Sequence, residues 1–272
     1  MRSLRGRVVL VTGGSAGIGR ATARRLAAAG ARVVVCGRDQ DRLDATAAEV
    51  PGLLTVRCDV TDADDRERLV RTAVERCGRV DALVNNAGRG AVGRLVDLDR
   101  ATVEDLVAVN FTAVAEMTRL VLPHLPDRGG DVVMMSSVAA WAPLPPLSLY
   151  SATKAGVSGL TAALRREVPR GVRVHLLCPA PTSTEWLARD QQGRPDEAEA
   201  PGKVSAGAAP ERVAAEVERC LTGRRSRTAA VPRWWGVTRL TSVPPLDRAL
   251  DAVLTPLAPS LVRAVTRYGR RL

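Results

Sequence analysis

The chain has 272 residues with a net charge of +11 at pH 7, and 46% of its residues are hydrophobic. This length and composition suit one large α/β domain with a sizeable core. No uncharged stretch reaches the roughly 18 residues of a membrane-spanning helix, the first apolar run is too short for a secretory signal, and the scattered cysteines favour neither disulfides nor a zinc site. We therefore expect a protein of the reducing cytoplasm.

Short apolar runs rich in β-branched residues recur along the chain from its N-terminus. Each is about six residues long, almost continuously apolar and bounded by Gly, Asp or Pro, which is typical of strands buried on both faces of a parallel sheet. The runs lie at residues 7–12, 31–36, 53–58, 80–85, 131–136 and 172–178.

The segments between these runs carry apolar residues at helical spacing, and several end at glycine. They lie at residues 17–30, 62–78, 101–125 and 150–168. Strict alternation of strand and helix implies right-handed crossovers and a doubly wound parallel sheet. The fold class is therefore predicted to be a three-layer α/β/α arrangement in a single domain.

The alternation weakens after residue 178. Residues 185–209 are rich in Pro, Gly, Ala and charge, which is typical of a long substrate loop or lid. A helix is expected over 210–223 because proline stands in its first turn, and a last short strand is expected over 227–232. These elements complete a predicted catalytic domain over residues 1–232.

Residues 233–272 form a basic amphipathic extension that several prolines interrupt. Residues 210–272 hold twelve arginines against five acidic residues. Because the prolines break any long helix, we expect the extension to pack on the domain or to form a subunit interface. Peripheral contact with an anionic membrane or with an acidic carrier protein is the alternative. Nucleic acid is not expected as a partner, because no recognition motif accompanies the basic residues.

A glycine-rich turn, TGGSAGIG, follows the first predicted strand and leads into a helix. Its glycines, Gly13, Gly17 and Gly19, suit a tight turn at which a pyrophosphate approaches the backbone and the helix N-terminus. The spacing is G-x-x-x-G-x-G. In the first β-α-β unit of a doubly wound sheet, this turn predicts a dinucleotide site.

The end of the second predicted strand should select the cofactor, because it lies beside the adenosine ribose. An acidic residue there would bind the 2′-hydroxyl of NAD, whereas an arginine forms charge-assisted bonds with the 2′-phosphate of NADP. The sequence has Gly37 where the acid would stand, followed by Arg38. Asp39 is the opposing candidate, although it is also a good helix N-cap. These residues favour NADP(H) over NAD(H).

The glycine turn, NNAG at 85–88 and YSATK at 150–154 occur in the order and spacing of a known family. With these motifs the chain resembles the short-chain dehydrogenase/reductase family over about residues 5–232. The resemblance implies a single Rossmann-type domain with a seven-stranded parallel sheet. It also implies an NAD(P)-dependent oxidoreductase that acts on CH–OH groups.

The same resemblance implies how the adenosine half of the cofactor is bound. The glycine turn, with Ser15 and Ile18, would hold the pyrophosphate and adenosine. Asp59 and Val60, which follow the third predicted strand, match the pair that contacts adenine in the family. One neighbouring residue departs from the pattern of NADP-preferring members, because Ala16 stands where a basic residue is often found.

At the nicotinamide end, the resemblance implies two further contacts. Asn86 would stabilise the central sheet beside the cofactor. Thr184 ends the segment PAPTST and would contact the nicotinamide carboxamide. Ala180 in this segment replaces the usual glycine, and it costs little unless the backbone needs a positive φ.

Four residues would form a proton-transfer site by the same resemblance: Asn110, Ser137, Tyr150 and Lys154. Ser137 precedes Tyr150 by the family interval, so it is chosen over its neighbour Ser136. Ser137 would donate a hydrogen bond to the substrate oxygen. Asn110 would hold a water that helps to carry the proton to solvent.

The spacing of Tyr150 and Lys154 has a chemical reason. Residues i and i+4 share one face of a helix, so the two side chains point the same way. A free tyrosine has a pKa of about 10, and a nearby ammonium would lower it toward neutral pH. Lysine is a compact charge that can also reach ribose hydroxyls, so both residues are expected to contact the cofactor as well.

The substrate is predicted only by class. Trp141, Leu144 and Leu147 would face the 185–209 loop, and this apolar wall predicts a hydrophobic ketone, aldehyde or alcohol. Trp141 and Trp186 are equally compatible with ordinary packing. The alternatives are a reductase of 3-oxoacyl thioesters on an acidic carrier protein and a non-catalytic NADP-binding regulator. A homodimer or homotetramer is expected.

Overall fold

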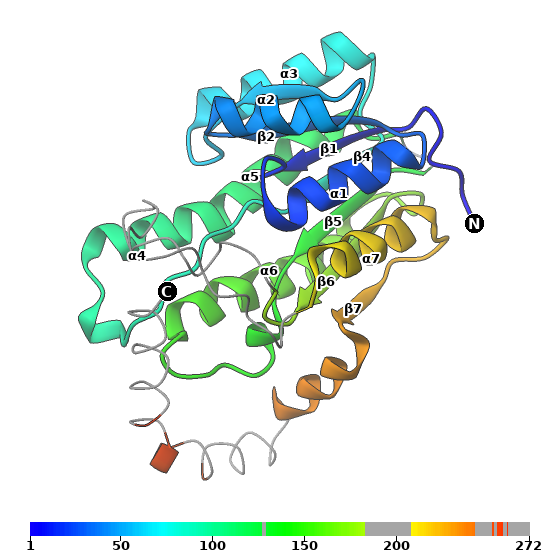
Figure 1. Ribbon diagram of the computed structural model, residues 1–272. Helices are drawn as coiled ribbons and strands as arrows, with labels where there is room; N and C mark the ends of the chain where they lie inside the picture. The colour runs from blue at the N-terminus through cyan, green and yellow to red at the C-terminus, as the bar shows by residue number, and fades with distance from the viewer. Residues whose placement is uncertain (127–128, 183–207, 243–251, 253–254, 258–259, 261–272) are drawn as a thin grey trace.

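The computed structural model describes residues 1–126, 129–182, 208–242, 252, 255–257 and 260. Within these residues the chain forms one sheet of seven parallel strands in the order β3-β2-β1-β4-β5-β6-β7 (Figure 1). The predicted fold class is confirmed. The strands are β1 (Val8–Thr12), β2 (Arg32–Gly37), β3 (Leu54–Arg57), β4 (Ala82–Asn85), β5 (Asp131–Met135), β6 (Arg173–Pro179) and β7 (Thr228–Val231).

Alternate strand residues point to opposite faces of the sheet, so each strand contributes to two apolar layers. Val8 and Leu10 of β1 lie in one core cluster, whereas Val9 and Val11 lie in the other. Both faces are covered by helices, which explains why the strands are apolar in nearly every position.

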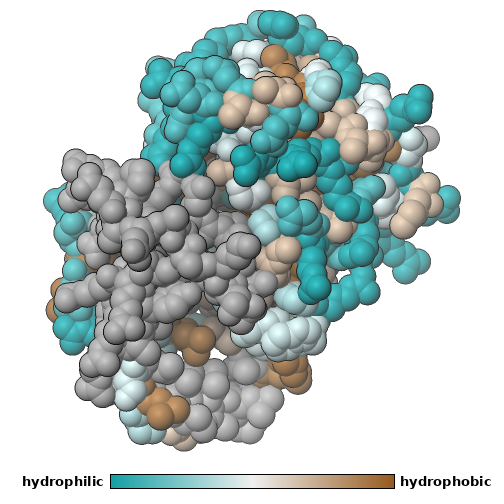
Figure 2. All heavy atoms as spheres, viewed as in Figure 1, coloured by the Kyte–Doolittle hydropathy of each residue, from teal (hydrophilic) through white to brown (hydrophobic). Residues whose placement is uncertain are grey.

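The helices divide between the two faces. Apolar residues of α3, α5 and α6 complete the first cluster, and those of α1, α2 and α7 complete the second. Figure 2 shows that the outer surface of the N-terminal helices is largely hydrophilic. The helices are α1 (Gly17–Ala28), α2 (Gln40–Glu49), α3 (Ala63–Cys77), α4 (Arg100–Val107), α5 (Ala113–Val121), α6 (Ser148–Glu167) and α7 (Pro210–Thr222).

The helix predicted over 101–125 is a composite. A π-helical turn (Ala108–Thr112) separates α4 from α5, and a 3-10 turn (Leu122–His124) follows. By length and composition this run could cross a membrane. Its residues Val114 and Met117 are instead buried in the first core cluster, which makes it a core helix of this fold. The π turn is the part that the sequence pattern did not predict.

The start of the C-terminal extension contacts the domain. A 3-10 segment, Arg233–Ser242, follows β7, and its Trp235 packs against the first core cluster. The Arg239 guanidinium lies 5.5 Å from the centroid of the Trp141 ring, a cation–π contact. Residues 185–207 of the predicted lid and most of the extension lie outside the described residues.

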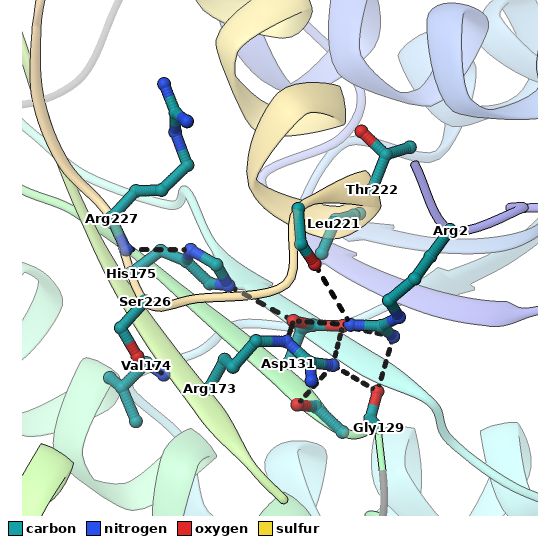
Figure 3. A network of polar contacts seen from close by, with 12 residues as sticks. Arg2, Gly129, Asp131, Arg173, Val174, His175, Leu221, Thr222, Ser226 and Arg227 are labelled. Atoms are coloured by element: carbon teal, nitrogen blue, oxygen red, sulfur yellow. Dashed lines mark hydrogen bonds and ion pairs between the residues drawn. The ribbon is translucent and has the colours of Figure 1, made fainter.

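At the amino end of the sheet, one buried carboxylate joins several elements (Figure 3). Asp131, the first residue of β5, is fully buried. Its oxygens accept hydrogen bonds from Arg2, Arg7 and Arg173 at 3.0, 2.6 and 2.7 Å. The same three guanidinium groups donate to the carbonyl of Gly129. The N-terminal segment, β1, β5 and β6 are therefore tied together at this end.

His175 of β6 completes this cluster. Its Nδ1 accepts a hydrogen bond from the backbone N–H of Arg227 at 3.2 Å, so the ring proton is on Nε2, which lies 3.1 Å from Asp131 Oδ1. Burial lowers the pKa of His175 and outweighs the opposing effect of Asp131. The imidazole is therefore neutral at pH 7 and donates to the carboxylate.

Candidate active site

The glycine turn lies at the carboxyl end of β1, where the strand order reverses between β1 and β4. Open parallel sheets bind ligands at such a switch point. Gly13 and Gly17 have φ values of 65° and 49°, a left-handed backbone that favours glycine. A Cβ on Gly19 would lie 2.0 Å from the Gly13 carbonyl oxygen. The first turn of α1, which includes Ile18, thus packs directly on the backbone of the glycine turn.

Asn86 and Thr12 hold the glycine turn in place. The Asn86 side chain donates from Nδ2 to the carbonyls of Thr12 and Gly13 at 2.9 and 3.1 Å. In return, Thr12 Oγ1 accepts the backbone N–H groups of Asn86 and Ala87, both at 3.0 Å. The NNAG segment therefore fixes the turn from the neighbouring strand, as a cofactor-binding loop requires.

The tip of β2 lies against the same turn. A Cβ on Gly37 would be 2.7 Å from Ser15 Oγ, so a side chain there would require the Ser15 hydroxyl to move. The Arg38 side chain is 55% exposed and lies 3.9 Å from Asp59 at its closest charged atoms. Asp39 caps α2, since its Oδ1 accepts the backbone N–H of Arg42 at 3.1 Å. Both side chains at this tip are about half exposed, and Asp39 also pairs with Arg42.

Asp59 and Val60 lie at the carboxyl end of β3. The Asp59 backbone N–H donates to Asp65 Oδ2 at 2.7 Å, and this bond lowers the pKa of Asp65. Asp59 Oδ1 accepts the backbone N–H of Thr61 at 2.9 Å. Val60 is 8% exposed, and its carbonyl accepts a bond from Arg66 at 2.8 Å. The segment is thus held in a defined conformation beside Arg38.

Tyr150 and Lys154 lie on one buried face of α6, with 7% and 4% of their surface exposed. Lys154 Nζ is 5.9 Å from the centroid of the Tyr150 ring and donates to the carbonyl of Met135 at 3.0 Å. A Cβ on Gly88 would lie 3.4 Å from the same Nζ. The lysine therefore lies between α6, the end of β5 and the NNAG segment.

The two serines after β5 have different partners. The Ser137 hydroxyl hydrogen-bonds with the Tyr150 side chain and accepts the backbone N–H of Ala139 at 3.2 Å. Ser136 Oγ instead donates to the backbone carbonyl of Lys154 at 2.8 Å. The fold thus brings Ser137 to the tyrosine hydroxyl and uses Ser136 to attach α6 to β5.

Burial dominates the electrostatics of this pair. It raises the pKa of Tyr150 to about 12, which the hydrogen bond with Ser137 only partly offsets, and it lowers the pKa of Lys154 to about 8. The expectation that Lys154 lowers the pKa of Tyr150 is therefore not met. The lysine donates to Met135, and the group that opposes desolvation of the phenol is Ser137 rather than the ammonium.

Asn110 lies in the π turn and is fully buried. Its Oδ1 accepts the backbone N–H of Arg89 at 2.8 Å, and its Nδ2 donates to the Arg89 carbonyl at 2.8 Å. Nδ2 also lies 3.3 Å from Thr153 Oγ1 on α6. The π turn, a feature frequent at functional sites, thus connects Asn110 with the residue that precedes Lys154.

The structure describes three residues of the predicted substrate wall, and the facing loop lies largely outside the described residues. Trp141 is buried, Leu144 is 40% exposed, and Leu147 packs against a small cluster that contains Tyr150. Thr184 and Trp186 lie outside the described residues.

Sequence reasoning did not assign Cys178 to the site. It treated this residue as a buried hydrophobe, yet its thiol hydrogen-bonds with Ser136 and interacts with Tyr150 and Lys154. Burial raises the pKa of Cys178 to about 12, so the thiol is neutral at pH 7. Its position directly before PAPTST was the signal that could have revealed it.

These residues fit a dinucleotide. The glycine turn offers bare backbone at a helix N-terminus, and Arg38 follows the end of β2. Lys154, on the same face of α6 as Tyr150, lies beside the end of β5 and the NNAG segment. The buried phenol and ammonium can hold and move a proton beside a ligand bound there.

Comparison with known proteins agrees with this arrangement. A family model described as short chain dehydrogenase matches residues 7–195. Dehydrogenase/reductase SDR family member 4 of Pongo abelii is 39% identical over 201 residues, which cover 70% of this chain and 72% of the relative.

Two solved structures are also similar. A short chain dehydrogenase/reductase from Burkholderia phymatum, in complex with NAD, aligns with a TM-score of 0.79 and 27% identity over 88% of this chain and 94% of its own. A 3-ketoacyl-(acyl-carrier-protein) reductase from Brucella melitensis, complexed with NADH, has a TM-score of 0.74 and 30% identity over 84% and 98%. With its sheet order, glycine turn and Tyr-Lys pair, the chain belongs to the short-chain dehydrogenase/reductase family of NAD(P)-dependent oxidoreductases.

Proposed function

We propose that the protein interconverts a hydrophobic ketone or aldehyde and the corresponding alcohol, with NADP(H) as its preferred cofactor. The observation that carries this proposal is the buried group of Ser137, Tyr150 and Lys154 beside the NNAG segment. Such a group holds a proton out of water, next to the place where a bound dinucleotide would end.

The preference for NADP(H) rests on the tip of β2. Gly37 carries no side chain, and Asp39 is engaged as the N-cap of α2. An exposed Arg38 with only a long contact to Asp59 can turn to a 2′-phosphate and form bidentate, charge-assisted bonds. Gly37 stands where an acidic side chain would bind a 2′-hydroxyl, so this position favours NADP(H).

The nicotinamide, when bound, supplies or accepts the hydride. The protein moves the proton: with its pKa raised to about 12, Tyr150 keeps its proton at neutral pH and can donate it to a substrate oxygen that gains negative charge. Ser137 hydrogen-bonds with this phenol and can orient it. Lys154, with a pKa of about 8, is mostly charged at pH 7, and its compact ammonium can bind a ribose hydroxyl of the cofactor. These protonation states favour carbonyl reduction at neutral pH.

The apolar surroundings of Tyr150 support a hydrophobic substrate. Ala91, Leu106 and Leu147 pack around the tyrosine. A small carbonyl compound with an apolar body would lose little by leaving water here, because the wall offers few polar partners. A screen of apolar ketones, aldehydes and alcohols, with each cofactor in turn and reduced nicotinamide followed by absorbance, tests the reaction and the cofactor together.

A 3-oxoacyl thioester on an acidic carrier protein is the second candidate substrate. The similarity to the Brucella melitensis reductase and the arginine surplus after residue 210 support it. The same screen separates the two candidates if it includes one 3-oxoacyl chain both as a free small thioester and on its carrier protein. A carrier-dependent increase in kcat/KM that high salt removes would favour the second candidate.

Arg38 offers the sharpest test of cofactor choice. We expect Arg38→Ala to raise the KM for NADPH by about tenfold or more, because a bidentate charged contact is lost, and to leave the KM for NADH within about twofold. Arg42→Ala is the matched control, since Arg42 lies on the same segment but pairs with Asp39. Equal effects of Arg38→Ala on both cofactors would contradict the proposed preference.

A further inference from the structure

The loop after β4 supports the proton-transfer site. The backbone of Arg89 exchanges two hydrogen bonds with the Asn110 amide, each 2.8 Å long. A Cβ on the preceding Gly88 would lie 3.3 Å from Asn110 Oδ1 and 3.4 Å from Lys154 Nζ. A shift of this loop by a fraction of an ångström would therefore move the contacts of Asn110 and Lys154 together.

The Arg89 side chain fixes this loop to a second element. Its NH1 group forms a close hydrogen-bonded ion pair with Asp105 Oδ2 of α4. The two side chains are only 20% and 32% exposed, so water screens the pair less than it screens a surface pair. Asp105 lies in the same helical run as Asn110. Arg89 thus contacts this run twice, through its backbone and through its side chain.

The same two elements also contact the catalytic tyrosine. Ala91, two residues after Arg89, packs in one buried cluster with Leu106 and Tyr150. Leu106 directly follows Asp105 in α4. The ion pair therefore connects the two segments whose apolar residues lie against the Tyr150 ring.

We propose that Arg89 and Asp105 are positioning residues whose ion pair holds Asn110 and Tyr150 in register for proton transfer. We expect the pair to set turnover rather than cofactor affinity, because the contacts of Arg89 described above are with Asn110 and α4. Neither residue reacts: each acts through the backbone and packing of the loop and of α4. The inference rests on the proposed carbonyl reduction for its kinetic test.

The chain offers a matched control a few residues away. Arg94 and Asp97 form an ion pair of the same type just beyond this loop, but their side chains are 59% and 50% exposed. An exposed pair contributes little to stability, and Arg94 donates both of its hydrogen bonds here to Asp97 rather than to Asn110. Arg94→Met and Asp97→Asn therefore reproduce the change in charge without the proposed change in position.

The kinetic test compares Arg89→Met, Asp105→Asn and the double variant, with NADPH and p-nitrobenzaldehyde as the probe substrate. We expect each single variant to lower kcat about tenfold with the KM for NADPH within about twofold, since a small misplacement slows proton transfer more than binding. The double variant should lose no more than either single one, because both remove the same interaction. Arg89→Lys should recover part of the loss.

Two kinetic outcomes would overturn the proposal. An unchanged kcat in Asp105→Asn would show that the pair positions nothing. A higher KM for the aldehyde with unchanged kcat would make Arg89 a substrate-binding residue instead. The control variants should match the wild type in both constants.

A second measurement does not depend on activity. The Arg89 amide proton is held by Asn110, so hydrogen exchange of the peptide that spans residues 86–93 reports the position of the loop. We expect exchange to become about tenfold faster in Asp105→Asn and to stay unchanged in Asp97→Asn. Unaltered exchange in Asp105→Asn would contradict the positioning role. If the wild type fails to reduce the aldehyde while exchange responds as expected, the proposed substrate class fails and the positioning role stands.

Discussion

The two ends of the sheet bury charged groups in opposite ways. At the amino end, Asp131 receives hydrogen bonds from three guanidinium groups and lies against a neutral histidine. At the carboxyl end, burial shifts the pKa of Tyr150 up and that of Lys154 down, and the nearby groups do not restore either one. The carboxylate of Asp131 has enough partners to stay charged and to stabilise the fold. Tyr150 and Lys154 have too few partners to offset burial, so their pKa values stay shifted, as is common at functional sites.

The largest expected effect is on chemistry at the carboxyl end. Tyr150→Phe removes the proton donor, and Lys154→Arg places a planar, larger cation where a compact one is needed. We expect each to lower kcat by about 10²- to 10⁴-fold with the fold retained, measured by nicotinamide absorbance and circular dichroism. Tyr268→Phe removes the other tyrosine of the chain and should leave turnover unchanged. A near-normal kcat in Tyr150→Phe would show that Tyr150 is not the proton donor.

Substitutions at the amino end should change the stability of the fold. Asp131→Asn leaves Arg2, Arg7 and Arg173 close together without their shared carboxylate. We expect a loss of about 3–5 kcal/mol in the free energy of unfolding, the range found when one partner of a buried ion cluster is removed. Urea unfolding measures it, with Asp97→Asn as an exposed control that should cost much less. A similar small cost for both variants would mean that the cluster adds little to stability.

At the carboxyl end, removal of a buried charge should raise the free energy of unfolding rather than lower it. Burial lowers the pKa of Lys154 from 10.5 to about 8, so the charged side chain destabilises the fold at neutral pH. We expect Lys154→Met to raise the free energy of unfolding by about 1–3 kcal/mol at pH 7, given about 1.4 kcal/mol per pKa unit and the lost bond to Met135.

The pH dependence of this gain identifies its cause. The charge penalty is complete below the folded pKa of about 8 and fades as the pH rises toward 10.5, where the unfolded lysine also becomes neutral. The advantage of Lys154→Met in urea unfolding should therefore shrink over that range. Lys154→Arg keeps a charge in place and should show no gain. A gain independent of pH would point to better packing by methionine instead.

The two ends also differ in how far the sequence predicts them. The strands, the glycine turn and the Tyr-Lys pair follow from local patterns, because apolar runs, glycines and an i, i+4 spacing need only a short window. The Asp131 cluster joins residues 2, 7, 131, 173 and 175, which only the finished sheet brings together. No local sequence pattern predicts this cluster.

Within the site itself, the missing parts have the same origin. The π turn interrupts a helix whose apolar spacing looks continuous, so the contact of Asn110 with Arg89 could not be foreseen. The raised pKa of Tyr150 depends on how completely the fold buries the phenol, and spacing does not contain that information. A motif predicts which groups meet, and packing decides their protonation.

The smallest expected effect tests the neutral histidine at the amino end. Burial holds the folded pKa of His175 below its usual 6.5, so as the pH falls the unfolded chain binds a proton before the folded chain does. Stability should therefore fall as the pH drops below about 6.5, with a slope of at most about 1.4 kcal/mol per pH unit from this one group. His175→Gln can still donate to Asp131 but cannot ionise, so urea unfolding between about pH 5 and 8 should give it a shallower slope. Equal slopes in the two proteins would mean that carboxylates alone set the acid sensitivity, and that the amino end holds no group whose protonation state depends on burial.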